Sequence, residues 1–170
     1  MTRGNLALRL HFLRDEANSG ENREDAMTEK NELIDIVGRI YKARKDNDID
    51  GLMQFVDPAC SFRIIGSPVL GDMTQRAADP DTMRNLHKSF MDTWDFCNIH
   101  TVSIHVDGDT VFAHHAGEIS FVPSGACFGA EFLDKMTFRD GRVIDVVQFI
   151  DTLQAADVMG LVKIQPKPAP

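Results

Sequence analysis

Apolar runs long enough to cross a membrane are missing from this sequence, and cysteine is scarce. No apolar stretch approaches the roughly 20 residues that a membrane-spanning helix needs, so we predict no membrane partner. The three cysteines, Cys60, Cys97 and Cys127, are far apart and form no CxxC pair. This usage is typical of reduced, half-buried thiols in a cytoplasmic protein.

Basic residues are also few. Lysine and arginine number 18 against 26 acidic residues, which gives a net charge of −8. Phosphate recognition needs clustered Lys and Arg, so we predict no nucleic-acid partner. The sequence has no internal repeat and no Gly-rich phosphate loop. Its 170 residues, 43% of them hydrophobic, fit one globular domain that buries about two-thirds of its unfolded surface.

The two ends differ from the middle of the chain. Residues 1–13 faintly resemble a signal peptide, but Arg9 and His11 interrupt the apolar stretch and no small-residue cleavage site follows. A polar segment comes next, so we expect residues 1–26 to be a mobile extension, consistent with an over-long start assignment. The folded domain is expected over residues 27–162, and residues 163–170 are expected to form a disordered, proline-rich tail.

Helical patterns occupy the first half of the domain. Apolar residues at helical spacing predict a helix over 29–45, and a shorter one follows over 49–55 until Asp57-Pro58 ends it. Asp79-Pro80 marks the start of a third helix, with a capping Asp and Pro at the first position. That third helix shows one apolar face: Met83, Leu86, Phe90 and Trp94.

Strand patterns fill the second half and are separated by tight turns that contain glycine or proline. The expected strands cover residues 60–65, 102–106, 111–122, 126–138 and 143–151, and a short helix over 152–159 closes the chain. Helices followed by an antiparallel meander predict an α+β fold, with the helices gathered on one side of the sheet.

Polar residues interrupt several apolar strand faces. Asp134 lies between Phe132 and Met136, Gln148 between Val146 and Ile150, His115 between Ala113 and Gly117, and Arg63 between Phe62 and Ile64. Neighbouring strands would bring Asp134, Gln148 and His115 together, and buried polar groups are costly unless paired. One explanation is a ligand pocket with apolar walls, in which Trp94 at the helix end forms the floor. The alternatives are a structural Arg63–Asp134 ion pair, or an Asp134 that faces solvent at a sheet edge.

Other candidate groups are weaker. His114 and His115, with His105, resemble metal ligands, but adjacent strand residues point to opposite faces, so we predict no metal site. Cys127 has no evident base partner and is assigned to the core rather than to catalysis. Asp151 is expected to cap the last helix.

The order of elements and three motifs resemble the nuclear transport factor 2-like superfamily, and within it the SnoaL-like polyketide cyclases and ketosteroid isomerases. The motifs are Asp48-Ile-Asp-Gly-Leu, the run from Asp134 to Ile144, and Phe149-Ile-Asp-Thr before the short helix. The resemblance covers about residues 29–160. It implies a cone-shaped, curved antiparallel sheet closed by three N-terminal helices and a short C-terminal helix. It also implies homodimers built through the sheet and no cofactor.

The family's catalytic residues carry over only in part. Asp134 falls where ketosteroid isomerases have the protonated Asp of their oxyanion hole. Their base would fall on Arg63, which cannot accept a proton. Their tyrosine would fall near Ile40, and Tyr41 lies one position, about 100°, further round the helix. In SnoaL-like cyclases, Asp134 would replace a supporting histidine and Gln148 the catalytic aspartate.

Two functions follow from this pattern. The first is an enzyme for isomerisation, cyclisation or related chemistry of a small apolar carbonyl compound such as a polyketide, steroid or terpenoid. Asp134 would be its general acid or base and His115 would support it. Arg63 and Gln148 would orient the ligand, and Trp94, Phe132, Met136 and Ile150 would form the apolar walls. The second is a non-catalytic ligand-binding or partner-binding domain, or an accessory subunit of an oxygenase.

Overall fold

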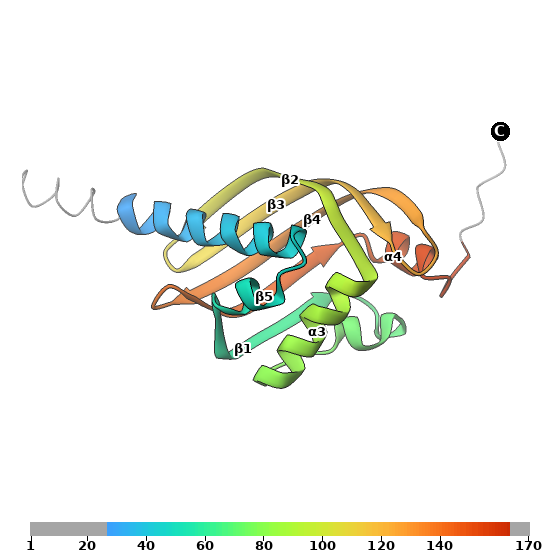
Figure 1. Ribbon diagram of the computed structural model, residues 1–170, viewed down its shortest axis with the longest axis horizontal. Helices are drawn as coiled ribbons and strands as arrows, with labels where there is room; N and C mark the ends of the chain where they lie inside the picture. Colours follow the sequence, from blue (N-terminus) through green and yellow to red (C-terminus); the bar gives the residue numbers. More distant parts are fainter. Residues whose placement is uncertain (1–26, 164–170) are drawn as a thin grey trace, which may run out of the picture.

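A curled five-stranded sheet organises the computed structural model, which describes residues 27–163. The strand order is β1-β5-β4-β3-β2 (Figure 1). The strands are β1 (Val56–Ile65), β2 (Trp94–Asp107), β3 (Thr110–Phe121), β4 (Ala126–Arg139) and β5 (Arg142–Ile150). The predicted α+β class is confirmed, with the sheet curled around the helices.

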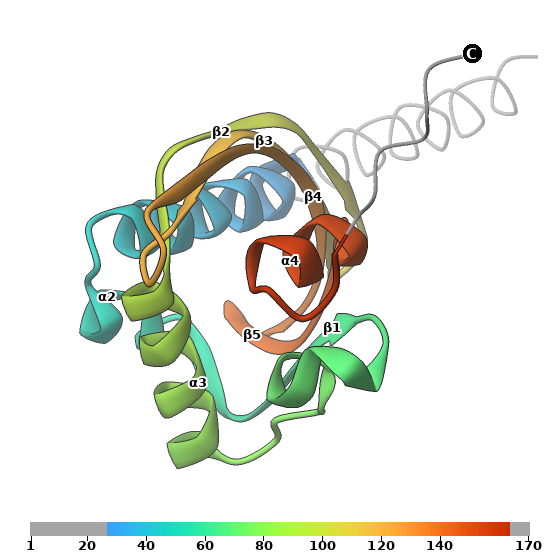
Figure 2. The ribbon, with the colours of Figure 1, turned by 90° about the vertical axis from the view of Figure 1, so that its right-hand side faces the viewer.

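Helices cover the concave side and one end of the sheet. The N-terminal helix includes residues 27–45. It is followed by α2 (Ile49–Met53), the short 3-10 segment η1 (Pro68–Thr74), α3 (Pro80–Thr93) and α4 (Thr152–Val158). The sheet arches over the N-terminal helix, and α4 lies at one end of the resulting cone (Figures 1 and 2).

Aspartates begin three of these helices, as their side-chain oxygens accept hydrogen bonds from backbone N–H groups that the helix leaves unpaired. Asp48 accepts from Gly51 N at 2.8 Å and Asp79 accepts from Thr82 N at 2.9 Å. Asp151 accepts from the backbone of α4 with both distances at 3.0 Å. The capping roles predicted for Asp79 and Asp151 are confirmed.

One strand pair differs from the expected antiparallel meander. β1 pairs with β5 in parallel, whereas β5, β4, β3 and β2 are antiparallel to their neighbours. Alternation of apolar residues shows which strand faces are buried, but it carries no information about the direction of the neighbouring strand. The strand order places β1 at the sheet edge, where Pro58 is tolerated because no ladder hydrogen bond is lost to a second neighbour.

Strand β2 begins eight positions earlier than the sequence pattern predicts. Trp94 is both the C-cap of α3 and the first residue of β2. The register of β2 against β3 shifts between Asp95 and Asn98 and again between Thr101 and Ser103. These bulges interrupt the alternation of apolar and polar residues, so the first half of the strand does not show the period of two.

Gly117 permits the bend of β3 against the bulged part of β2. Its φ of 144° is one that L side chains rarely adopt, and a Cβ atom there would lie 2.3 Å from the carbonyl oxygen of Asn98. Only glycine fits this close approach of two backbones. The bend contributes to the curl seen along the cone axis in Figure 2.

The inner face of the sheet is the one that the alternation predicts. On β4, Phe132, Asp134, Met136 and Phe138 are all buried. Val37 and Tyr41 of the N-terminal helix belong to the same core. Burial of this apolar face against the helices stabilises the cone, at about 25 cal/mol for each Å² removed from water.

The predictions for the two ends of the chain, for membrane-spanning helices and for the cysteines have different outcomes. The extension expected over 1–26 lies outside the described residues, as does nearly all of the tail expected over 163–170. No helix among residues 27–163 is long and apolar enough to cross a membrane. Cys60 is a buried free thiol, but Cys127 is exposed, so its assignment to the core is wrong. The alternation of β4 places Cys127 on the opposite face from the half-buried Ala126 and Phe128, so its side chain points outward.

Candidate functional site

The interior of the cone contains two cavities, which we call the apolar chamber and the polar chamber. The apolar chamber has about 50 Å³ of free interior within about 500 Å³ of unfilled space that includes its mouth. The polar chamber has about 40 Å³ within about 430 Å³. Residues lining the apolar chamber include Ile64, Phe90, Trp94, Phe132, Gln148 and Ile150. Those lining the polar chamber include Tyr41, Arg44, Phe62, His87, Asp134 and Met136.

The chambers lie end to end along the strands, because shared elements contribute neighbouring same-face residues to each. The pairs, polar chamber first, are Phe62 and Ile64, Asp134 and Phe132, Val146 and Gln148, and His87 and Phe90. Spacings of two on a strand and three on a helix keep both members on one face. Ala155 of α4 lines the apolar chamber, so this chamber lies toward the α4 end of the cone.

A buried hydrogen bond joins the N-terminal helix to β4 in the polar chamber. The Tyr41 hydroxyl donates to Asp134 Oδ2, and the Asp134 residue is only 2% exposed. Gln148 stands opposite Asp134 in the β4–β5 register and is also buried. Asp134 Oδ1 has no hydrogen-bond partner within the described residues. A buried carboxyl oxygen without a partner is costly, so the site retains a capacity for one more hydrogen bond.

Burial sets the protonation of this pair. Removal from water raises the pKa of Asp134 because it penalises the charged carboxylate, while Arg44, Tyr41 and Gln148 act in the opposite direction. Burial, together with the neighbouring Asp134, raises the pKa of Tyr41 well above its ordinary value. Both groups therefore favour their neutral, proton-carrying forms, and Asp134 is suited to donate a hydrogen bond rather than to accept a proton.

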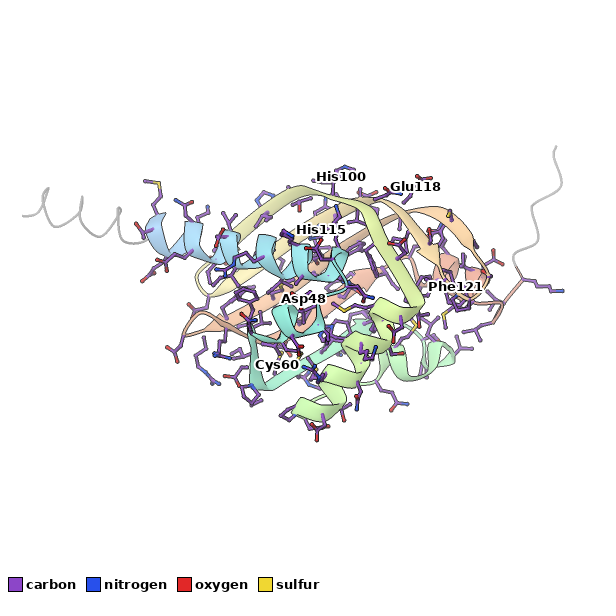
Figure 3. All side chains as sticks on the ribbon, viewed as in Figure 1. Asp48, Cys60, His100, His115, Glu118 and Phe121 are labelled. Atoms are coloured by element: carbon purple, nitrogen blue, oxygen red, sulfur yellow. The ribbon has the colours of Figure 1, made fainter. Side chains whose placement is uncertain are left out.

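His115 supports the Tyr41 ring from behind. The residue is 1% exposed, and its ring contacts both Tyr41, at 3.7 Å between ring centroids, and Phe132, at 5.2 Å. Figure 3 shows His115 between the N-terminal helix and the arch of β2 and β3. Its Nδ1 is 3.4 Å from Thr101 Oγ1, and its Nε2 has no partner among the described residues. Burial lowers the pKa of His115 to about 4, so the imidazole is neutral near pH 7.

Arg44 and His87 belong to the site, although the sequence analysis did not select them. Both line the polar chamber with Asp134. The Arg44 guanidinium lies 3.8 Å from the centroid of the Phe96 ring, and the His87 ring packs edge-on to Phe62 at 5.3 Å. Burial and the charge of Arg44 lower the pKa of His87 to about 4, so His87 is a neutral acceptor.

A signal for both residues was present in the sequence. Arg44 lies seven positions after the buried Val37, on the same helix face, and His87 lies four positions after the buried Met83. A polar residue in the apolar stripe of a helix indicates a buried polar group, as Asp134 does on the apolar face of its strand.

The predicted site residues divide into four groups. Trp94, Phe132, Gln148 and Ile150 line the apolar chamber, and Asp134 and Met136 line the polar chamber. His115 stands behind Tyr41. Arg63 is not part of the cluster, because its side chain is exposed between the buried Phe62 and Ile64.

Two structural alternatives for Asp134 are wrong. An Arg63–Asp134 ion pair does not form, since an exposed side chain of β1 and a buried side chain of β4 point to opposite faces of the sheet. A solvent-facing Asp134 is excluded by its burial. The tyrosine expected one position out of place does reach the carboxyl, because the face of the N-terminal helix that packs on the sheet is wide enough to bury both Ile40 and Tyr41.

No group of three or more His, Cys, Asp or Glu side chains capable of holding a metal ion occurs among residues 27–163. His114 instead pairs with Glu131 on the other side of the sheet from His115, at 2.6 Å from Nε2 to Oε1. The strand alternation thus separates the two adjacent histidines as predicted.

Comparison with known proteins gives a family and a set of similar folds. The model of the SnoaL-like domain matches residues 37–146. A proposed isomerase from Bacillus subtilis has a TM-score of 0.70 at 14% identity, with 81% of this chain and 99% of that chain covered. A proposed SnoaL-like polyketide cyclase from Jannaschia sp. CCS1 has a TM-score of 0.63 at 16% identity, covering 80% and 94%. An LEH-like epoxide hydrolase from M. tuberculosis has a TM-score of 0.59 at 15% identity, covering 77% and 89%. No curated protein sequence matches.

Proposed function

The chain belongs to the SnoaL-like domain family, and we propose that it binds a small, largely apolar carbonyl compound in the two chambers of its cone. The observation that carries this proposal is the buried Tyr41–Asp134 pair, whose second carboxyl oxygen is unpaired and lines a cavity. An apolar body would occupy the apolar chamber, and the carbonyl oxygen would lie against the pair.

The chemistry that fits this arrangement is cofactor-independent enolisation and isomerisation. Asp134, neutral through burial, donates a hydrogen bond to the carbonyl oxygen and stabilises the negative charge that develops there. His87, a neutral imidazole in the same chamber, takes a proton from the carbon next to the carbonyl, and the C–H electrons shift onto the oxygen. Return of the proton to another carbon completes an isomerisation without any net change in oxidation state.

His115 has a positioning role in this scheme. It contacts Tyr41 and Phe132 but lines neither chamber. Its stacked ring fixes the direction of the Tyr41 hydroxyl, and thereby the direction of the Asp134 carboxyl. Gln148, opposite Asp134 in the register, is a second donor for the ligand oxygen where the chambers meet.

A non-catalytic binding domain is the second candidate. It is favoured by the hydrogen bond itself, because the Tyr41 hydroxyl is used within the protein and is not directed at a ligand. The accessory-subunit interpretation, the cytoplasmic location and the expectation of no cofactor stay predictions.

A second copy of the chain is proposed as the partner of the outer sheet face. Phe149 is 45% exposed there and stands opposite Leu133 in the β4–β5 register. Both line a shallow hollow with Phe112 and His114. The face carries a contact between His114 Nε2 and Glu131 Oε1 beside the apolar residues, so it offers polar and apolar groups to an identical face.

The test is a thermal-shift screen of small apolar carbonyl compounds, followed by turnover assays on those that bind. A ligand at 100 times its dissociation constant adds about 2.7 kcal/mol to stability. Asp134→Asn is expected to bind the same compounds and to lose turnover by about 100-fold or more. The control is Asp35→Asn, at an exposed position of the N-terminal helix. Equal turnover by Asp134→Asn would show that Asp134 is not the acid.

A further inference from the structure

The charges of the side chains that line the polar chamber do not balance one another. Burial raises the pKa values of Tyr41 and Asp134 and lowers that of His87, so it favours the neutral form of all three side chains. Arg44 lines the same chamber, and a guanidinium keeps its proton in proteins. Arg44 therefore contributes the fixed charge of the chamber, and this charge is positive.

Arg44 is held at the junction between the two chambers. Its guanidinium lies 3.8 Å from the centroid of Phe96, and Phe96 lines the apolar chamber. The cation–π contact over the face of the ring holds the guanidinium at this place. Among the described residues no carboxylate forms a salt bridge with Arg44.

A half-buried guanidinium without a counter-ion favours an anion as its neighbour. Asp134 is close enough to be influenced by the charge of Arg44, but burial raises the pKa of that carboxyl and so favours its neutral form. The second oxygen of Asp134 is unpaired and lines the same cavity. A guanidinium fork beside a neutral carboxyl donor matches a ligand group with two oxygens, one charged.

We propose that the ligand is an organic anion: a carboxylate or an acidic enol on a one- or two-ring apolar body, with its charged oxygens on Arg44 and its rings in the apolar chamber. This inference rests on the proposed function, since it names the ligand class of the same chambers. The apolar chamber limits the size of the body, because its free interior of about 50 Å³ opens through its mouth into about 500 Å³ of unfilled space.

The experiment compares two probes of the same shape, 2-naphthoate and 2-naphthamide, by titration calorimetry. Wild type is expected to bind the acid at least about tenfold more tightly than the amide. Arg44→Met, which keeps the apolar stem, is expected to lose that preference by weakening the acid alone. Arg63→Met, at an exposed position on the outer face of β1, is the matched control and is expected to keep it.

Other outcomes overturn the inference in distinguishable ways. Equal binding of acid and amide to wild type contradicts the anion preference and leaves the carbonyl pocket standing. A preference for the acid that persists in Arg44→Met contradicts the role of Arg44. The same conclusion follows if Arg44→Met binds neither the acid nor the amide while its melting temperature equals that of wild type. Failure of both probes and of every carbonyl compound in the screen contradicts the anion preference and the proposed function together.

Discussion

Tyr41 and Asp134 are 93 positions apart in the sequence and share a buried hydrogen bond in the cone. The bond ties the N-terminal helix to β4 at the chamber wall. It joins two groups whose neutral forms are favoured by burial, so it holds a proton-carrying carboxyl in an apolar surrounding without a formal ion pair. This hydrogen bond explains why the buried Asp134 on the apolar face of β4 is compatible with a stable fold.

Removal of the Tyr41 hydroxyl is expected to destabilise the protein. Tyr41→Phe leaves Asp134 Oδ2 buried without its donor, which costs about 1–3 kcal/mol. Urea unfolding measures the change in the free energy of unfolding. The same substitution in an Asp134→Asn background completes a double-mutant cycle, and we expect the two effects to be coupled rather than additive. Additive effects would mean that the bond contributes nothing to stability.

His87 is expected to make the fold sensitive to acid. Burial lowers its pKa from 6.5 to about 4, so between these values the unfolded chain binds a proton that the folded chain excludes. Its contribution is fully present above pH 6.5 and is lost as the pH falls toward about 4. His87→Gln should therefore reduce the loss of stability over this range by about 1–3 kcal/mol, measured by urea unfolding at several pH values.

The matched control for that titration is His105→Gln, at an exposed position of β2. His115 contributes in the same direction, since burial also lowers its pKa to about 4. The His87→Gln variant is thus expected to keep part of the acid sensitivity. A pH profile that is the same in His87→Gln and wild type would contradict the burial of an uncharged His87.

Neighbouring positions on β5 test the apolar chamber. Ile150 lines the chamber and Phe149 faces the outside. The larger side chain in Ile150→Trp occupies part of the free space of the chamber, so this substitution is expected to weaken ligand binding at least about tenfold. Phe149→Trp, one residue away on the opposite face, should bind as wild type does. Calorimetric titration with a compound from the screen gives both dissociation constants, and equal weakening by the two substitutions would place the ligand elsewhere.

The outer face of the sheet is expected to hold two copies together. Phe149→Lys puts a charge into the apolar hollow that Phe149 shares with Leu133, and buried unpaired charges are strongly unfavourable at interfaces. Analytical ultracentrifugation should show a dimer for wild type and a monomer for the variant. Val69→Lys, at a more exposed apolar position away from the sheet in η1, should leave the dimer intact. A wild-type monomer at all concentrations would rule out this interface.

Strand periodicity predicted the inner face of the cone well. Asp134 and His115 were recognised because a period of two leaves no doubt about which neighbours share their face. The direction of β1 and the first half of β2 were not predicted, because pairing direction leaves no trace in alternation and two bulges disrupt it. Arg63 was misplaced for a related reason: its two apolar neighbours, Phe62 and Ile64, put it on the outer face by the same rule.

The helical members of the site show a different lesson. Arg44 and His87 lie in the apolar stripes of their helices. They were not predicted because the apolar residues of each stripe were used to place the helix, and the polar residues on the same face were not considered. Tyr41 was set aside because one residue is about 100° on a helix. The side chain is long enough for its hydroxyl to reach Asp134 all the same.

The protonation of Asp134 is the central claim, and a carbon NMR titration of its carboxyl tests it most directly. A carboxyl with a raised pKa stabilises the fold at acid pH, and this contribution is lost as the pH rises from 3.8 through the folded pKa. The carboxyl carbon, assigned by comparison with Asp134→Asn, is expected to show the neutral acid well above the ordinary range of aspartate. A signal that titrates in that ordinary range, near 3.8, would show a carboxylate in the chamber and would contradict both the acid role and the unbalanced positive charge of Arg44.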